Sequence, residues 1–175
     1  GRLIKGKNVN MVEIAGGCVC CSLTGEFEKA VEEIMEKVDP DMIVVETTGV
    51  AEPDALIYDV IENISDLRID SIITVVDSYS MIKYPDIGYT GRIQIEVGDV
   101  IILNKIDLLE NHGIADVERK IKEFNERAVI LKAIYCDVDI ESILGLSGGK
   151  YVKSIKHDEH FDSFVFRSKK VLQKE

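Results

Sequence analysis

The chain has 175 residues and a formal net charge of −11, and apolar residues make up 46% of it. This composition is typical of one well-buried globular domain, and no apolar run approaches the roughly 18 residues that span a bilayer. The acidic charge, the lack of a basic stripe and the absence of Trp argue against a nucleic acid or an anionic membrane as the partner.

Short apolar runs rich in Val and Ile alternate along the chain with helical patterns. Because polar residues rarely interrupt these runs, they predict strands buried on both faces of a parallel sheet. The predicted strands are Met11–Ile14, Met42–Val45, Ile72–Val76, Val100–Leu103 and Ala128–Ile134. Repeated strand–helix units of this kind predict an α/β fold with a doubly wound, mainly parallel sheet.

Apolar spacings of three and four predict helices between these strands. Thr24 is the expected N-cap of a first helix that the Asp39-Pro40 pair stops, and Pro53 is the expected first residue of a second, which runs to about Asn63. A third helix is predicted around Val117, Ile121 and Phe124, and a short fourth from Asp139 to Gly145.

Cys18, Cys20 and Cys21 place three of the four cysteines within four consecutive positions. Thiolates bind zinc and similar ions strongly, and such close spacing gathers them at little entropic cost. Three ligands leave a fourth coordination position open, which suits an ion that is handed on. A redox pair and inert apolar packing are the alternatives. Clustered rather than dispersed cysteines favour a reducing cytosol.

Glu46 and Gly49 directly follow the predicted strand Met42–Val45. Ligands of open α/β sheets bind at the carboxyl ends of strands. An acid there can hold the water shell of Mg²⁺, and a glycine three residues on lets a backbone N–H reach a phosphate oxygen. An ordinary strand-to-helix turn is the alternative.

Asn104-Lys105-Ile106-Asp107 follows the strand Val100–Leu103 and has the spacing of a guanine-recognition loop. The Asp107 carboxylate can accept both N–H donors of the guanine edge, the Asn104 amide can serve O6 and N7, and the Lys105 stem can cover the ring. Adenine lacks that donor pair, so such a site discriminates against it. An ordinary polar turn is the alternative, but two such loops in one sheet favour guanine nucleotide binding.

The phosphate-binding loop that this reading requires is not evident in the sequence. Residues 1–8 fit the spacing G-x-x-x-x-G-K, but Asn8 stands where Ser or Thr is needed. No strand is predicted before them and no helix after them, so we do not expect a P-loop here. A chain without one should bind GTP poorly and hydrolyse little of it.

In this order, the cysteine cluster and the two loops closely resemble those of the CobW-type metallochaperone GTPases, a branch of the P-loop GTPases shared with the nickel-insertion proteins of hydrogenase and urease. Four stretches carry the resemblance: Gly17–Leu23, Pro40–Pro53, Gln94–Leu108 and Phe161–Ser168. It implies a nucleotide- and metal-binding domain over residues 1–146 that lacks the family's first strand, P-loop and first helix. A linker over 147–160 and the start of a C-terminal domain over 161–175 would follow.

The resemblance also implies roles for the motif residues. The three clustered cysteines would bind Zn²⁺, Co²⁺ or Ni²⁺, Glu46 would be the acid on the Mg²⁺ side, and Gly49 would sense the γ-phosphate of GTP. The loop at Asn104, Lys105 and Asp107 would bind guanine. The segment around Tyr135 would border the base, and Cys136, where the family commonly has glycine, would be a lone thiol.

The expected function is that of a cytoplasmic, GTP-dependent metal chaperone that delivers its ion to a client metalloenzyme. The complete protein would then be a GTP hydrolase, and a homo-oligomer is compatible with this reading. The alternatives are a metal-binding module without nucleotide hydrolysis and a thiol redox module. His157 and His160 could ligate a metal, but a solvated linker is favoured.

Overall fold

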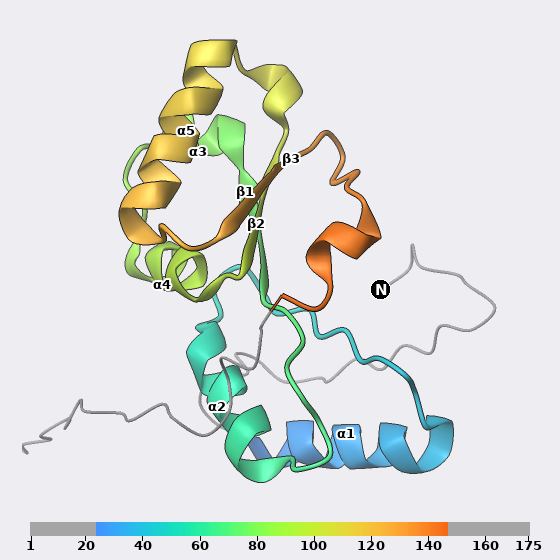
Figure 1. Ribbon diagram of the computed structural model, residues 1–175. Coiled ribbons are helices and arrows are strands. Elements are labelled where there is room, and N and C mark those ends of the chain that lie inside the picture. The colour runs from blue at the N-terminus through green and yellow to red at the C-terminus, as the bar shows by residue number, and fades with distance from the viewer. Residues whose placement is uncertain (1–23, 147–175) are drawn as a thin grey trace, which may run out of the picture.

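The computed structural model describes residues 24–146, which form a three-stranded parallel sheet with helices packed on one face and beyond one end (Figure 1). The strands lie in the order β1 (Ile73–Asp77), β2 (Val100–Asn104) and β3 (Val129–Lys132). The helices are α1 (Thr24–Val38), α2 (Pro53–Asn63), α3 (Ser78–Lys83), α4 (Tyr89–Val97) and α5 (Asn111–Phe124), with 3-10 turns η1 (Ile106–Leu108) and η2 (Ile140–Ile143). The predicted α/β class and parallel sheet are confirmed.

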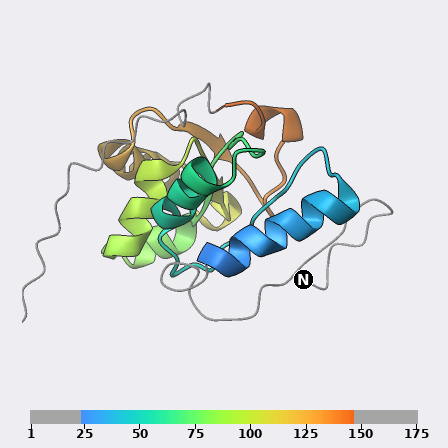
Figure 2. The same ribbon diagram turned by 90° about the horizontal axis from the view of Figure 1, so that it is seen from below.

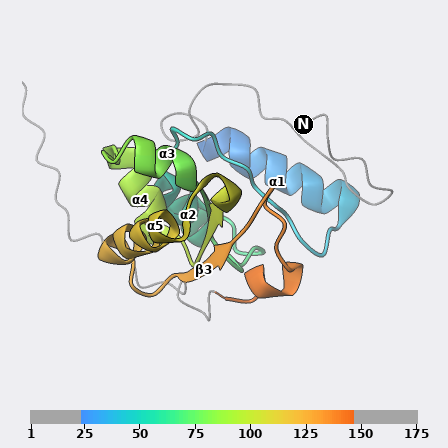
Figure 3. The same cartoon turned by 90° about the horizontal axis from the view of Figure 1, so that it is seen from above.

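The central strand β2 organises the core, because both of its faces are covered. Ile101 and Leu103 are fully buried against a cluster contributed by α3, α4 and α5. On the other face, Val100 and Ile102 pack with Ala133 and with apolar side chains of the η2 segment. Figures 1 and 3 show the same arrangement, with the three helices on one side of the sheet and η2 on the other. The two-sided burial predicted for this strand is confirmed.

β1 departs from the prediction of burial on both faces. It is an edge strand of the described sheet, and Val75 is 55% exposed. Val75 is in register with Ile102, so it lies on the face of the sheet opposite α3, α4 and α5. Among residues 24–146, the η2 segment covers this face only over β2 and β3. The apolar run therefore predicted the strand correctly, but not the exposure of one of its two faces.

The predicted strand Met42–Val45 is wrong for the described structure. The segment between α1 and α2 has no regular secondary structure, and Val44 is 84% exposed. A strand needs a neighbour that accepts and donates its backbone hydrogen bonds, and no described strand pairs with this segment. The other predicted strand without a counterpart, Met11–Ile14, lies outside the described residues.

The predicted helix boundaries agree closely with the structure. The first predicted helix corresponds to α1, which ends at Val38, immediately before Asp39 with its φ of 46°, and α2 begins at Pro53 and ends at Asn63 as expected. The predicted short fourth helix is η2, and the Asp139 side chain accepts a hydrogen bond from the Glu141 amide at its start. In Figure 1, α1 and α2 lie together below the sheet, and in Figure 2, which is seen from below, these two helices are in front of it.

No helix is predicted from the sequence between β1 and β2, where the structure has both α3 and α4. Two parallel neighbours need a crossover connection, so a helix was required here. α3 has only six residues and α4 contains Gly91, so neither has a long apolar period that marks a helix in a sequence. No helix among residues 24–146 combines the length and the apolar character needed to cross a membrane.

Asn125 joins α4, β2 and β3 at the amino end of the sheet. Its amide nitrogen donates to the carbonyl oxygens of Ile95 and Gly98 at 2.8 and 2.9 Å, and to that of Glu96 at 3.1 Å. Its amide oxygen accepts from the Ala128 N–H at 3.0 Å, directly before β3. The Asn125 side chain therefore supplies hydrogen-bond partners to backbone groups in two loops, the one between α4 and β2 and the one between α5 and β3.

We expect Asn125→Ala to lower the free energy of unfolding by about 2–3 kcal/mol, because several part-buried backbone groups lose their partner. Chemical denaturation monitored by circular dichroism measures this change. Asn111→Ala, at an exposed asparagine of α5, is the matched control and should stay within about 0.5 kcal/mol of the wild type. Equal stabilities of the two variants would contradict the role given to Asn125.

Candidate functional site

The carboxyl ends of the three strands meet at one edge of the sheet, and polar residues follow each of them. Asp77 at the end of β1 is in register with Asn104 at the end of β2. Lys132 ends β3 beside Leu103, and the chain then continues to Tyr135 and Cys136. Parallel sheets bind ligands at this edge, so these loops are the candidate site.

Asn104 connects the loop after β2 to the loop after β3. Its side-chain oxygen accepts the backbone N–H of Cys136 at 2.9 Å. The Ala133 N–H also donates to the Leu103 carbonyl oxygen at 2.9 Å, which continues the strand pairing up to the site. Because the side-chain oxygen of Asn104 accepts this hydrogen bond, the side-chain NH₂ group is the donor that can bind a ligand. The O6 and N7 atoms of guanine are suitable acceptors for it.

Three of the four non-glycine residues with positive φ among those described lie at this edge. Lys105 has a φ of 61°, and Tyr135 and Cys136 both have a φ of 57°. A left-handed backbone costs a non-glycine residue roughly 1–2 kcal/mol, and such residues concentrate at functional sites. The strain thus falls on the two loops that the sequence assigned to the base.

An ion pair joins β1 to the loop after β2. The Lys105 Nζ atom lies 2.5 Å from an oxygen of the Asp77 carboxylate. The hydrogen bond from Lys105, with a further one from the Ser80 amide, holds the pKa of Asp77 below its usual value. The carboxylate in turn raises the pKa of Lys105. Both groups are therefore charged at neutral pH.

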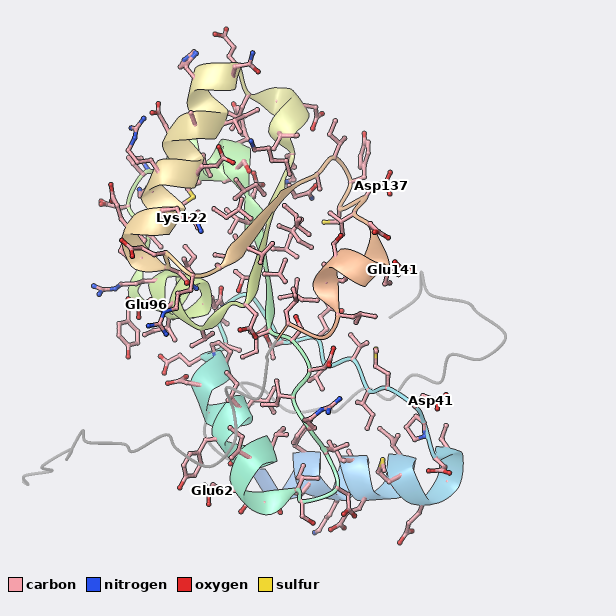
Figure 4. All side chains as sticks on the ribbon, in the orientation of Figure 1. Asp41, Glu62, Glu96, Lys122, Asp137 and Glu141 are labelled. Atoms are coloured by element: carbon pink, nitrogen blue, oxygen red, sulfur yellow. The ribbon has the colours of Figure 1, made fainter. Side chains whose placement is uncertain are left out.

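Asp107 and Tyr135 are the accessible members of the site. Asp107 lies in the turn η1 and is exposed, and Tyr135 is 93% exposed. The Ile106 N–H donates to the Ala133 carbonyl oxygen at 3.5 Å, so the Asp107 turn and the Tyr135 segment are adjacent. Figure 4 labels Asp137 in this segment, on the side of the sheet away from α5. These two candidate side chains thus face solvent, on loops that follow strands of the sheet.

Glu46 and Gly49 lie away from this edge. The Gln94 side chain of α4 donates to the Gly49 carbonyl oxygen at 3.2 Å, and the Gln94 carbonyl oxygen accepts the Thr74 hydroxyl at 2.6 Å. Thr74 is near the start of β1, about 10 Å along the strand from the Asp77 end. Both Glu46 and Gly49 are exposed, in a segment that passes the lower end of the sheet in Figure 1. The described structure brings together the predicted guanine loop and Tyr135 but not these two residues.

The predicted metal ligands Cys18, Cys20 and Cys21 lie outside the described residues, as do His157 and His160. Within the described range, no three His, Cys, Asp or Glu side chains gather as potential metal ligands. Cys136 is exposed and carries a free thiol. The metal site therefore stays a prediction from the sequence.

The family model for the CobW/HypB/UreG nucleotide-binding domain matches residues 1–132. The chain belongs to this family. The match runs through both the cysteine cluster and the Asn104 loop, so the resemblance inferred from the motifs is confirmed at the level of the family.

Individual relatives agree with this assignment. The chain is 36% identical over 143 residues to zinc-regulated GTPase metalloprotein activator 1 of Schizosaccharomyces pombe, an alignment that covers 77% of the chain and 34% of that protein. It is 25% identical over 197 residues to the zinc chaperone CobW of a Sinorhizobium species, with 89% and 56% covered. The chain thus spans about a third to just over half of the length of these relatives.

A crystal structure of the Zn(II)-bound YjiA GTPase from E. coli has the same fold. The TM-score is 0.57 at 20% identity, and the superposition covers 67% of this chain and 38% of the other. This likeness supports the parallel α/β arrangement of β1, β2 and β3.

Sequence reasoning missed two features of the site. Asp77 follows an apolar strand in the same way as Asn104, so the rule that selected Asn104 could have selected it too. The second missed feature is the hydrogen bond from the Cys136 backbone N–H to the Asn104 side chain. A backbone donor cannot be recognised from a pattern of side chains. The left-handed conformation of Cys136 does explain why glycine would suit this position.

We expect Cys136→Gly to raise the free energy of unfolding by about 1 kcal/mol, because glycine adopts a φ of 57° without a Cβ clash. The hydrogen bond to Asn104 is retained, since its donor is a backbone group. Thermal and chemical denaturation measure the change. Cys136→Ala keeps the Cβ and serves as the control; an equal gain in that variant would show that the thiol, not the backbone, limits stability.

Proposed function

We propose that this chain is the nucleotide- and metal-binding part of a GTP-dependent zinc chaperone. The observation that carries the proposal is the pair of loops joined at the carboxyl edge of the sheet. The Asn104 side chain accepts the Cys136 N–H, and the Asp107 side chain is exposed. The family membership and the names of the relatives, a zinc-regulated GTPase metalloprotein activator and a zinc chaperone, support GTP and zinc as the ligands.

In the proposed nucleotide site, guanine binds across the ends of β2 and β3. Asp107 accepts the two N–H donors of the base, the Asn104 amide donates to its opposite edge, and Tyr135 borders it. Mg²⁺ accompanies the phosphates, with Glu46 as its acid and Gly49 as the residue that responds to the γ-phosphate. Since Glu46 and Gly49 lie at the other end of the sheet, this part of the proposal requires their segment to move.

In the proposed metal site, Cys18, Cys20 and Cys21 bind zinc as a cargo ion, with Co²⁺ and Ni²⁺ as further candidates. GTP binding orders the loops around the cysteines, and hydrolysis in the complete protein releases the ion to a client metalloprotein in the cytoplasm. We favour zinc over Co²⁺ and Ni²⁺ because the names of the two relatives described above both refer to zinc.

Titration of the ¹⁵N-labelled chain with GDP, and separately with ADP, tests the nucleotide site. GDP should shift the amide resonances of Asp107 and Cys136, and ADP at equal concentration should leave them in place. Equal shifts with both nucleotides would contradict guanine recognition, as would shifts confined to the amino end of the sheet.

A further inference from the structure

Asp77 belongs to none of the motifs that identify the guanine loop, yet it lies within the candidate site. It ends β1, directly beside Asn104 in the neighbouring strand. Its side chain is only about one-third exposed, and both of its carboxylate oxygens are engaged. Its carboxylate therefore links the end of β1 to the start of α3 and to the loop after β2.

The two oxygens of Asp77 act on different elements. Oδ1 accepts the Ser80 N–H at 2.9 Å and so caps the start of α3. Oδ2 accepts a hydrogen bond from Lys105 Nζ at 2.5 Å. The cap alone would fix the carboxylate whether or not Lys105 were present. The Lys105 ammonium is therefore bound to an acceptor that is already held in place.

Lys105 is anchored at both ends of its side chain. Its backbone is fixed in the left-handed region, and its carbonyl oxygen accepts the Leu108 N–H at 3.1 Å, which closes the turn that carries Asp107. Its ammonium group is fixed on β1. The four-carbon stem then spans the edge of the sheet between two fixed points, although Lys side chains are ordinarily flexible.

We propose that Asp77 is a positioning residue of the guanine site, which holds the Lys105 stem across the carboxyl edge of the sheet so that it presents an ordered apolar surface to the purine ring. This inference rests on the guanine-binding function proposed above. A stem that is ordered before the base arrives loses less conformational entropy on binding. The gain concerns the ring face, not the edge that Asp107 reads, so it applies to guanine and hypoxanthine bases alike.

Asp77→Asn is the main test, because Asn retains an oxygen that can cap α3 but lacks the charge that binds Lys105. We expect its affinities for GDP and IDP to fall together by about 3- to 10-fold, as for the loss of one pre-ordered side chain. Asp77→Ala removes the cap as well and shows the added cost of disturbing α3. The Ser80 amide exchange rate should rise in Asp77→Ala and stay near wild type in Asp77→Asn.

A double-mutant cycle with Lys105→Met separates positioning from a general structural role. Met keeps an apolar stem without the ammonium, so Asp77→Asn should have no further effect on GDP affinity in that background. Without any nucleotide, ¹³C-methylation of the lysines should show that the pKa of Lys105 falls in Asp77→Asn.

The outcomes distinguish the two proposals. If the wild type binds GDP and Asp77→Asn binds it equally well, the role of Asp77 is wrong and guanine binding stands. Additive effects of Asp77→Asn and Lys105→Met, or an unchanged Lys105 pKa, would also overturn that role. If the complete protein does not bind GDP at all, the proposed function fails and this inference fails with it.

Discussion

Replacement of Cys18, Cys20 and Cys21 by serine should abolish zinc binding, and Cys20→Ser alone should weaken it by more than about 100-fold. Loss of an outer partner of a metal ligand already costs about 10–100-fold in affinity, and loss of a thiolate ligand costs more. Competition with a chromogenic zinc chelator, under reducing conditions, measures the affinity and the stoichiometry of one ion per chain.

The fourth cysteine provides the matched control for this experiment. Cys136 is more than 100 positions from the cluster in the sequence, follows β3 and carries an exposed free thiol. Cys136→Ser should bind zinc as the wild type does. If it lost zinc as severely as Cys20→Ser, the assignment of the ion to the cluster would be wrong. A readily formed disulfide within the cluster, together with no stoichiometric zinc, would instead favour the redox alternative.

Asp107→Asn should change the base preference of the site by about 100-fold. The exposed Asp107 carboxylate is expected to accept two N–H donors of guanine, and charge-assisted hydrogen bonds contribute about 1.5–3 kcal/mol each. Asparagine offers one acceptor and one donor instead, which suits xanthine because it has a carbonyl oxygen where guanine has its amino group. The ratio of the dissociation constants for GDP and XDP, from NMR titration, measures the change.

Glu110→Gln is the control for this prediction, since Glu110 is an exposed acid just beyond the turn that carries Asp107. It makes the same change of charge and should leave the GDP to XDP ratio unaltered. If Glu110→Gln and Asp107→Asn both weakened GDP binding without a change in the ratio, the acidic charge alone would attract the nucleotide. Asp107 would then have no role in reading the base.

The elements that could be predicted from the sequence are those with strong local signals. Pro53 and the Asp39-Pro40 pair marked helix ends, and the apolar run at Val100–Leu103 marked the buried central strand. The Asn104 loop could be placed at the carboxyl edge because its position follows directly from the strand before it. Its spacing also carried a chemical meaning, so a candidate site could be predicted together with the fold.

The misses have a common physical cause, which is that strand formation depends on a partner elsewhere in the chain. Met42–Val45 has the composition of a buried strand, but no described strand pairs with it and Val44 is exposed. The expectation that Glu46, like Asn104, would follow a strand of the sheet rested on that segment. Asp77 could have been selected as a strand-end residue, but its contact with Lys105, in the loop after the adjacent strand, depends on the pairing of β1 with β2.

The zinc affinity of the complete protein with GTP bound, compared with GDP bound, tests the proposed coupling most directly. We expect the two zinc affinities to differ, because coupling energies between two sites are typically about 1–3 kcal/mol, or 5- to 150-fold. Chelator competition in the presence of GDP or a slowly hydrolysed GTP analogue, each with Mg²⁺, measures both values on one preparation. Identical zinc affinities in the two nucleotide states would contradict the proposed coupling between nucleotide and zinc.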